Sequence, residues 1–182
     1  MTIEDTLQLA LEAHRGQTDL DGMPFVLHPL AVGLMGSSEA EIKTGFLHDV
    51  VEDTPLTLDD LRTRGVDEEV LGALALLTHD KSLDYFDYVR RIIASGNRLA
   101  IRTKLSDLQH NISRGARSYR RTLERGDTSM SERLARINAK HQQALKLFSG
   151  IALTDCCRDL PTAAVLPDPS QAIPDGADPA DA

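Results

Sequence analysis

The sequence predicts an all-α protein, folded as a compact bundle of about seven or eight helices. Apolar residues recur at helical spacing along nearly the whole chain, and no convincing alternating strand pattern is present. The chain also lacks GxGxxG and GxxxxGK loops, which argues against an open α/β nucleotide-binding fold. Its 182 residues fit one domain with a tail.

The first two helices are marked by their starting residues and by the loop between them. Thr2 is a suitable N-cap for a helix with apolar residues at i, i+4 and i+7. Residues 19–24 (DLDGMP) have the composition of a turn. Pro29 suits the first position of a short second helix, because its missing N–H is not needed there.

The later helices follow from capping residues and periodicity. A capping box of Ser38 and Glu41 predicts a third helix that runs to about Asp53. Thr57 begins a fourth helix, which Gly65 ends. Periodicity predicts further helices over residues 68–79, 84–95, 98–113 and 131–149.

The chain divides into a folded part and a tail. We assign residues 1–150 to the folded domain. Residues 158–182 are rich in Pro, Asp and Ala, and such a segment cannot bury enough apolar surface to offset its ordering entropy. We therefore expect the tail to be disordered.

Composition and charge argue against several classes of protein. A net charge of −8 argues against nucleic-acid binding. The apolar runs are far shorter than the roughly 20 residues that cross a bilayer, so no membrane association is expected. The acidic N-terminal segment is unlike a signal peptide, which favours a cytoplasmic protein. The adjacent Cys156 and Cys157 are expected to be reduced thiols without a chemical role.

Positive charge is concentrated in one segment of the chain. Residues 114–146 contain nine Lys and Arg against three acids. Such a run is most often a solvated helix face, and the sharper alternative is a rim that faces a phosphate. The sequence alone favours the solvated face.

The segment from His48 to Asp53 concentrates ionisable groups. On a helix, residues four apart share a face, so Glu52 would lie beside His48 and Asp53 beside Asp49. Carboxylates this close together are costly without a cation. An imidazole next to a carboxylate is a mixed N/O ligand pair, which indicates a divalent metal.

Two further segments can complete such a site. His28 opens a helix and can project inward from a fixed backbone. Lys104, Asp107 and Asn111 fall on one helix face and offer an ammonium, a carboxylate and an amide. Each residue also has an ordinary interpretation, as a helix cap, a core residue or a surface ion pair. Their apolar flanking residues favour the metal site.

Four segments together resemble a known family. Residues 13–17 (AHRGQ), 24–29 (PFVLHP), 47–54 (LHDVVEDT) and 104–111 (KLSDLQHN) resemble the HD-superfamily hydrolase domain of the RelA/SpoT homologues, and above all its small stand-alone alarmone hydrolases. The match in order and spacing extends over about residues 1–148. The family fold is a bundle of α-helices. Bifunctional members carry a separate nucleotidyl-transfer domain after this one; no such segment follows here, and synthetase activity is not expected.

The resemblance implies a role for each candidate residue. One divalent metal, manganese in the family, would be bound by His28, His48, Asp49 and Asp107. Glu52 and Asp53 would orient or deprotonate the attacking water. The substrate would be contacted by Lys104, Asn111 and Arg15. The implied activity is removal of the 3′-pyrophosphate from guanosine tetra- or pentaphosphate, or from a closely related purine alarmone.

One loop departs from the family pattern. Where the alarmone hydrolases usually carry a basic pair over the nucleotide, this chain has Thr18, Asp19, Leu20 and Asp21. Acids at that place should weaken nucleotide binding by about 1–3 kcal/mol per lost charge-assisted bond.

Two alternatives therefore stay open. The first is an HD phosphohydrolase that acts on another nucleotide, such as an adenine alarmone, a nucleoside monophosphate or a reduced dinucleotide phosphate. The second is a metal-bound nucleotide sensor without turnover, although a sensor has no need of both Glu52 and Asp53. The sequence leaves the oligomeric state open.

Overall fold

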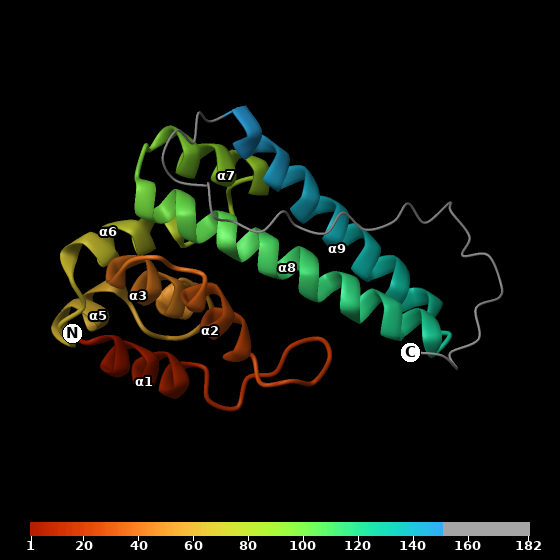
Figure 1. Cartoon of the computed structure of the whole chain (residues 1–182), viewed down its shortest axis with the longest axis horizontal. Coiled ribbons are helices and arrows are strands. Elements are labelled where there is room, and N and C mark those ends of the chain that lie inside the picture. Colours follow the sequence, from red (N-terminus) through yellow and green to blue (C-terminus); the bar gives the residue numbers. More distant parts are fainter. Residues whose placement is uncertain (151–182) are drawn as a thin grey trace, which may run out of the picture.

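The computed structural model describes residues 1–150, and all of its regular elements are helices (Figure 1). They are α1 (Ile3–Ala13), α2 (Leu27–Leu34), α3 (Glu39–Leu47), α4 (Val50–Asp53), α5 (Leu58–Thr63), α6 (Glu68–Leu77), α7 (Tyr85–Ala94), α8 (Arg98–Glu124), α9 (Thr128–Lys146) and the 3-10 helix η1 (Leu147–Gly150). The only extended pairing in this part of the chain is an isolated bridge between Thr18 and Pro24. The all-α prediction is confirmed, and the expected tail lies outside the described residues.

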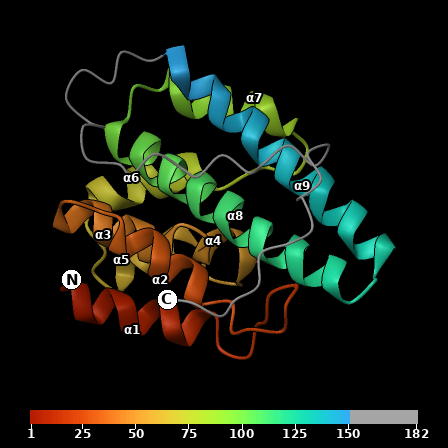
Figure 2. The same ribbon diagram turned by 45° about the vertical axis from the view of Figure 1, so that its right-hand side comes forward.

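The longest helix, α8, organises the molecule. α9 runs back beside α8, and the two helices extend past the others as a hairpin (Figures 1 and 2). Helices α1 to α6 gather at the first half of α8, and α7 lies near its start and near the end of α9. None of the described helices has the length and apolar character needed to cross a membrane.

The hydrophobic core lies where these helices face α8. Its largest fully buried side chains include Leu47, Leu74, Ile92 and Leu108, none of which is more than 2% exposed. Burial of one such side chain contributes roughly 1.5–3 kcal/mol. The core therefore fixes the first half of α8 against α3, α6 and α7, and it is this half that carries Lys104, Asp107 and Asn111.

Three helices begin at the residues that the sequence predicted. Thr2 forms a complete capping box with Asp5, and Thr57 forms one with Asp60. Ser38 accepts the Glu41 N–H at 3.3 Å, but the Glu41 carboxylate bonds to Ser37 rather than returning to the N-cap. Each cap satisfies backbone donors that the first turn leaves without partners.

The helix predicted to run to Asp53 is divided in two. α3 ends at Leu47 and α4 begins at Val50, so His48 and Asp49 lie at the junction. The His48 Nδ1–H donates to the Gly45 carbonyl oxygen at 2.7 Å. That carbonyl would accept the Asp49 N–H in a continuous helix. At the junction, the His48 imidazole thus takes the place of the Asp49 N–H as the donor to this carbonyl, and the bond fixes the orientation of the ring.

Two other boundaries differ from the sequence prediction. α2 begins at Leu27, which places Pro29 third in the first turn, where its missing N–H still costs nothing. α8 continues to Glu124, well past residue 113. The polar residues of this extension form helix because they have α9 as a partner: Ser118 and Thr122 are buried in the hairpin.

Two glycines let α2 and α3 touch through their backbones. A Cβ at Gly45 would lie 2.5 Å from the Cα of Gly33, and a Cβ at Gly33 would lie 2.2 Å from Phe46 Cδ1. Real Cβ contacts are not this short, so only glycine fits at either position. This close approach brings His28 on α2 next to His48 at the end of α3.

Candidate metal centre and active site

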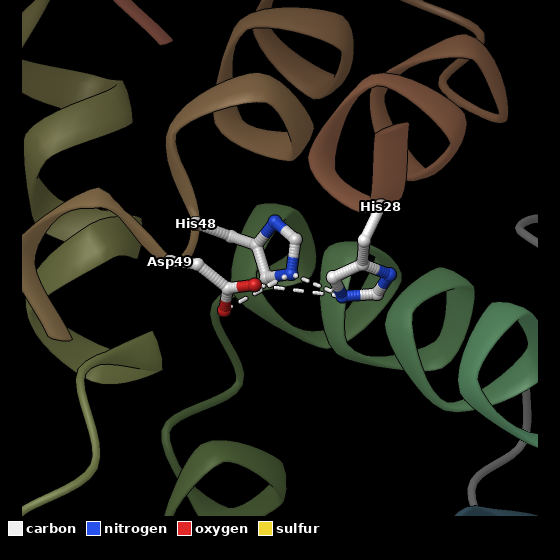
Figure 3. Close-up of side chains that lie close together, drawn as sticks. All are labelled: His28, His48 and Asp49. Atoms are coloured by element: carbon white, nitrogen blue, oxygen red, sulfur yellow. Dashed lines mark hydrogen bonds and ion pairs between the residues drawn. The ribbon is translucent and has the colours of Figure 1, made fainter. Parts of the chain in front are cut away.

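Four predicted ligands converge from three parts of the chain. His28 comes from α2, His48 and Asp49 from the α3–α4 junction, and Asp107 from α8. His28 Nε2 lies 3.1 Å from Asp107 Oδ1 and 3.5 Å from Asp49 Oδ2, and His48 Nε2 lies 3.2 Å from Asp49 Oδ1 (Figure 3). Donors that share one cation at about 2.0–2.2 Å are separated by about 3–4 Å. His28, His48 and Asp49 each offer a donor atom within 4.8 Å of the others, so these three can hold a single divalent ion, and Asp107 lies beside them against His28.

The two imidazoles present the same nitrogen to this centre. His48 Nε2 and His28 Nε2 lie 3.3 Å apart, and both rings are nearly fully buried. Because a carbonyl oxygen only accepts, the bond to Gly45 requires a proton on His48 Nδ1, and Nε2 is the nitrogen that faces the centre. Two lone pairs that face each other in a buried site need a proton or a metal ion between them.

The carboxylates set the charge of the centre. Burial alone would lower the pKa of His48, but the neighbouring Asp49 and Asp107 raise it to about 9. Burial would raise the pKa of Asp107, but the Lys104 ammonium, with His28 and His48, holds it well below its usual range. Asp107 is therefore ionised at neutral pH and attracts a cation.

Lys104 and Asn111 both hold the Asp107 carboxylate. Lys104 Nζ donates to Asp107 Oδ2 at 2.8 Å, and Asn111 Nδ2 donates to Asp107 Oδ1 at 2.5 Å. The Lys104 ammonium also lies 5.1 Å from the centre of the Tyr88 ring and 5.6 Å from that of Tyr85. Burial opposes the charge on Lys104, but Asp107 raises its pKa, so it stays protonated.

A cavity of about 200 Å³ opens onto the centre. It is lined by seven predicted site residues, which are His28, Asp49, Glu52, Asp53, Lys104, Asp107 and Asn111. His48 is buried and is not among the lining residues. Arg15 is exposed after the end of α1 and does not line the cavity, so its predicted substrate contact has no support from its position.

Glu52 and Asp53 occupy different surroundings within the cavity. Glu52 Oε2 accepts the backbone N–H of His79 at 3.1 Å, which fixes the carboxylate without neutralising it. Asp53 lies at the cavity edge with much of its side chain exposed; the burial of the remainder, followed by the charges of Asp49 and Glu52, raises its pKa. Two acids with different environments can divide the tasks of accepting a proton and orienting water.

The AHRGQ segment holds the backbone of Asp53. Gln17 Nε2 donates to the Asp53 carbonyl oxygen at 2.9 Å. Its Oε1 therefore accepts from Nδ1 of the buried His14, at 2.8 Å. These bonds tie α1 to the end of α4, which gives His14 and Gln17 a structural role.

Several cavity residues were not predicted from the sequence. His79, Tyr85 and Tyr88 form an aromatic wall in which ring centres lie 4.5 to 6.1 Å apart. Arg114 and His141 also line the cavity. Arg114 opens the basic run 114–146, which was the one available signal; the others had none, because they meet the site only through tertiary packing.

The loop of residues 18–21, here called the acidic loop, contacts α8 through both of its acids. Arg114 Nη1 lies 3.4 Å from Asp19 Oδ2, and the Ser118 hydroxyl donates to Asp21 Oδ2. Arg114 Nη2 also donates to Asn111 Oδ1 at 3.2 Å. A second, smaller cavity of about 60 Å³ adjoins the first and shares Asn111, Arg114 and His141 with it. The charge of Asp19 is thus partly offset by Arg114.

Comparisons with curated proteins find short and medium-length similarities. No family model matches the chain. A guanosine-3′,5′-bis(diphosphate) 3′-pyrophosphohydrolase of Danio rerio is 32% identical over 117 residues, which cover 57% of this chain and 62% of that protein. The bifunctional (p)ppGpp synthase/hydrolase SpoT of Escherichia coli is 33% identical over 116 residues, 57% of this chain and 16% of SpoT. A GTP pyrophosphokinase of Streptomyces coelicolor is 45% identical over 64 residues, 33% of this chain and 8% of that enzyme.

The chain thus spans less than two thirds of each of these relatives. Among solved structures, a metazoan SpoT orthologue that hydrolyses ppGpp matches with a TM-score of 0.55 and 27% sequence identity. That match covers 79% of this chain and 85% of the other. Sequence and structure therefore agree on the same group of relatives.

Proposed function

We propose that this chain, which belongs to the HD-type hydrolase domain family of the RelA/SpoT homologues, is a metal-dependent phosphohydrolase. Its proposed reaction is removal of the 3′-pyrophosphate from guanosine tetra- or pentaphosphate, or from a closely related purine alarmone. The observation that carries the proposal is a cavity lined by His28, Asp49, Asp107, Glu52 and Asp53, with the buried His48 directly behind Asp49.

The donor set suits one divalent ion, and we propose Mn²⁺ as that ion. Two imidazole nitrogens and two carboxylates form a mixed N/O site of the kind that such ions occupy. When bound, the ion supplies Lewis-acid chemistry and lowers the pKa of a coordinated water. Lys104 and Asn111 hold Asp107 in place, and His48 is held by the Gly45 carbonyl.

The protein residues divide the remaining tasks. Glu52, held by the His79 N–H, is placed to accept a proton from the attacking water, and Asp53 at the cavity edge is placed to orient that water. Lys104 and Asn111 each retain N–H groups beyond those given to Asp107, which are available to phosphate oxygens. Arg114 also lines the cavity, where its charge is shared with Asp19.

The two acids of the Thr18–Asp21 loop are both paired, so they oppose an anionic substrate less than unpaired acids would. Asp19 is paired with Arg114 and Asp21 with the Ser118 hydroxyl, so neither acid stands alone beside the cavity. The Danio rerio and Escherichia coli relatives bear names that specify guanosine tetraphosphate chemistry, and this supports the same nucleotide class here. A cytoplasmic location, and the absence of nucleic-acid or membrane partners, remain predictions.

The test is a substrate panel with product identification. Metal-depleted protein is reloaded with Mn²⁺ and incubated with guanosine and adenosine alarmones, nucleoside monophosphates and a reduced dinucleotide phosphate. We expect pyrophosphate release from the guanosine alarmones, and a loss of about 10²- to 10⁴-fold in Glu52→Gln, which retains shape but not basicity. Tight nucleotide binding without any product in the metal-loaded protein would instead establish the sensor.

A further inference from the structure

His28 Nδ1, the ring nitrogen that does not face the proposed metal site, contacts His110, a residue with no role in the proposed reaction. His28 Nε2 faces Asp49 and Asp107, and Figure 3 shows its second ring nitrogen pointing away from His48 and Asp49. This Nδ1 lies 2.7 Å from His110 Nδ1, and the planes of the two rings are 22° apart with their centres 5.0 Å from each other. His110 is partly buried and does not line the cavity.

We propose that His110 is a positioning residue that holds His28 in the tautomer required for metal binding. The inference rests on the proposed function, because it assumes that His28 is a metal ligand. His110 would act only through His28, since its own side chain is not among those that line the cavity.

The position of one proton decides the chemistry of His28. Two ring nitrogens 2.7 Å apart need a single proton between them. If His110 holds that proton, the neutral His28 carries its own proton on Nε2, which points at the Asp107 carboxylate and blocks the metal. If His28 Nδ1 holds it and His110 accepts, Nε2 presents a lone pair to the centre. Metal binding therefore requires His110 to be the acceptor.

His48 is held in the same tautomer by a different device. Its Nδ1–H donates to the Gly45 carbonyl, a group that can only accept, so the backbone fixes this proton. His28 has the side chain of His110 at the equivalent place. α8 thus contributes Asp107 to the centre and, three residues later on the same face, the group that orients a second ligand from α2.

The experiment removes the acceptor and then restores it. His110→Leu has no acceptor, whereas His110→Asn retains an amide oxygen that, like the lost Nδ1, is attached to Cγ and can accept from His28 Nδ1. Gln109→Leu, at the neighbouring position of α8, is the matched control. The measurements are Mn²⁺ affinity by calorimetry, the absorption spectrum of the Co²⁺-loaded protein, and the ¹⁵N resonances of His28 in the Zn²⁺-loaded protein, with thermal unfolding to confirm that each variant is folded.

We expect His110→Leu to bind Mn²⁺ about 10- to 100-fold more weakly, with an altered Co²⁺ spectrum. His110→Asn should regain most of the affinity, and Gln109→Leu should match the wild type. The wild-type ¹⁵N spectrum should show His28 protonated on Nδ1.

Two results would overturn the proposal: wild-type affinity and spectrum in His110→Leu, or equal damage in the folded Leu and Asn variants. Failure of the proposed function is separable from this, because a wild type that binds Mn²⁺ but cleaves no alarmone still lets the affinity series decide the role of His110. A wild type that binds no divalent ion would end both proposals.

Discussion

Buried and exposed charges lie in different parts of α8. In the first half, Lys104 and Asp107 are buried, paired with each other and directed at the cavity. In the second half, Arg117, Arg120 and Arg121 are exposed on the hairpin with α9. The helix is the same, and the difference comes from the helices that enclose its first half. A charge becomes part of a site where neighbouring helices remove it from water.

The largest expected effect comes from breaking the buried pair. Lys104→Met removes the ammonium and leaves the Asp107 carboxylate buried beside an apolar side chain. We expect the metal-free protein to lose about 3–5 kcal/mol of unfolding free energy, measured by chemical denaturation. Added Mn²⁺ should recover part of this loss, because the ion supplies the missing positive charge. A loss below about 1 kcal/mol would show that Asp107 is already well solvated.

A smaller effect is expected from the close contact that joins the two histidines. Gly45→Ala places a methyl group 2.5 Å from the Gly33 Cα, so α2 must move away from α3. We expect a loss of about 1–3 kcal/mol of stability and weaker Mn²⁺ binding. The control is Gly72→Ala on α6, where a Cβ meets nothing within 4 Å, and which should stabilise the protein by about 0.5–1 kcal/mol. Equal stability of the two variants would contradict the packing argument.

The pH dependence of metal binding tests the charge state of the buried His48. Because Asp49 and Asp107 raise the pKa of His48 to about 9, a metal ion at pH 7 must displace a proton from it. The apparent Mn²⁺ affinity should therefore rise about tenfold per pH unit up to about pH 9, with about one proton released per ion at pH 7. Calorimetry in buffers of different ionisation enthalpy measures that proton, and binding without proton release would refute the assignment.

The same shift gives a signed prediction for the metal-free protein. The folded pKa of His48 lies above its unfolded value of about 6.5. Its contribution to stability is therefore fully present below about pH 6.5 and is lost as the pH rises through about 9. Chemical denaturation of the metal-free protein should give a lower unfolding free energy at pH 9 than at pH 6.

The smallest effect is expected on the exposed half of α8. Arg121→Met makes the same kind of change as Lys104→Met, but at an exposed position where the guanidinium is solvated. We expect a change in unfolding free energy within about 0.5 kcal/mol and no change in Mn²⁺ affinity. A loss comparable to that of Lys104→Met would erase the distinction between the two halves.

Local signals in the sequence predicted much of this arrangement. The caps at Thr2 and Thr57 and the helical periodicity gave the correct fold class, because these signals involve residues only a few positions apart. Seven of the nine predicted site residues line one cavity, and an eighth, His48, is buried at the centre.

The features that the sequence did not predict depend on distant contacts. The break at His48 follows from an imidazole that takes a helical carbonyl, and the extension of α8 to Glu124 follows from its packing on α9. The acidic loop was expected to weaken nucleotide binding, whereas Asp19 pairs with Arg114, 95 residues away. The expected cost of that acid cannot be read from its sequence position, because its partner is set by the fold.

The most direct test of the central claim is a Mn²⁺ titration of metal-depleted protein in the presence of guanosine tetraphosphate, followed by product analysis. Hydrolysis should rise with added ion, saturate at one ion per chain, and yield guanosine diphosphate and pyrophosphate. Saturation of the site formed by His28, His48, Asp49 and Asp107 with the nucleotide still intact would contradict the proposed function.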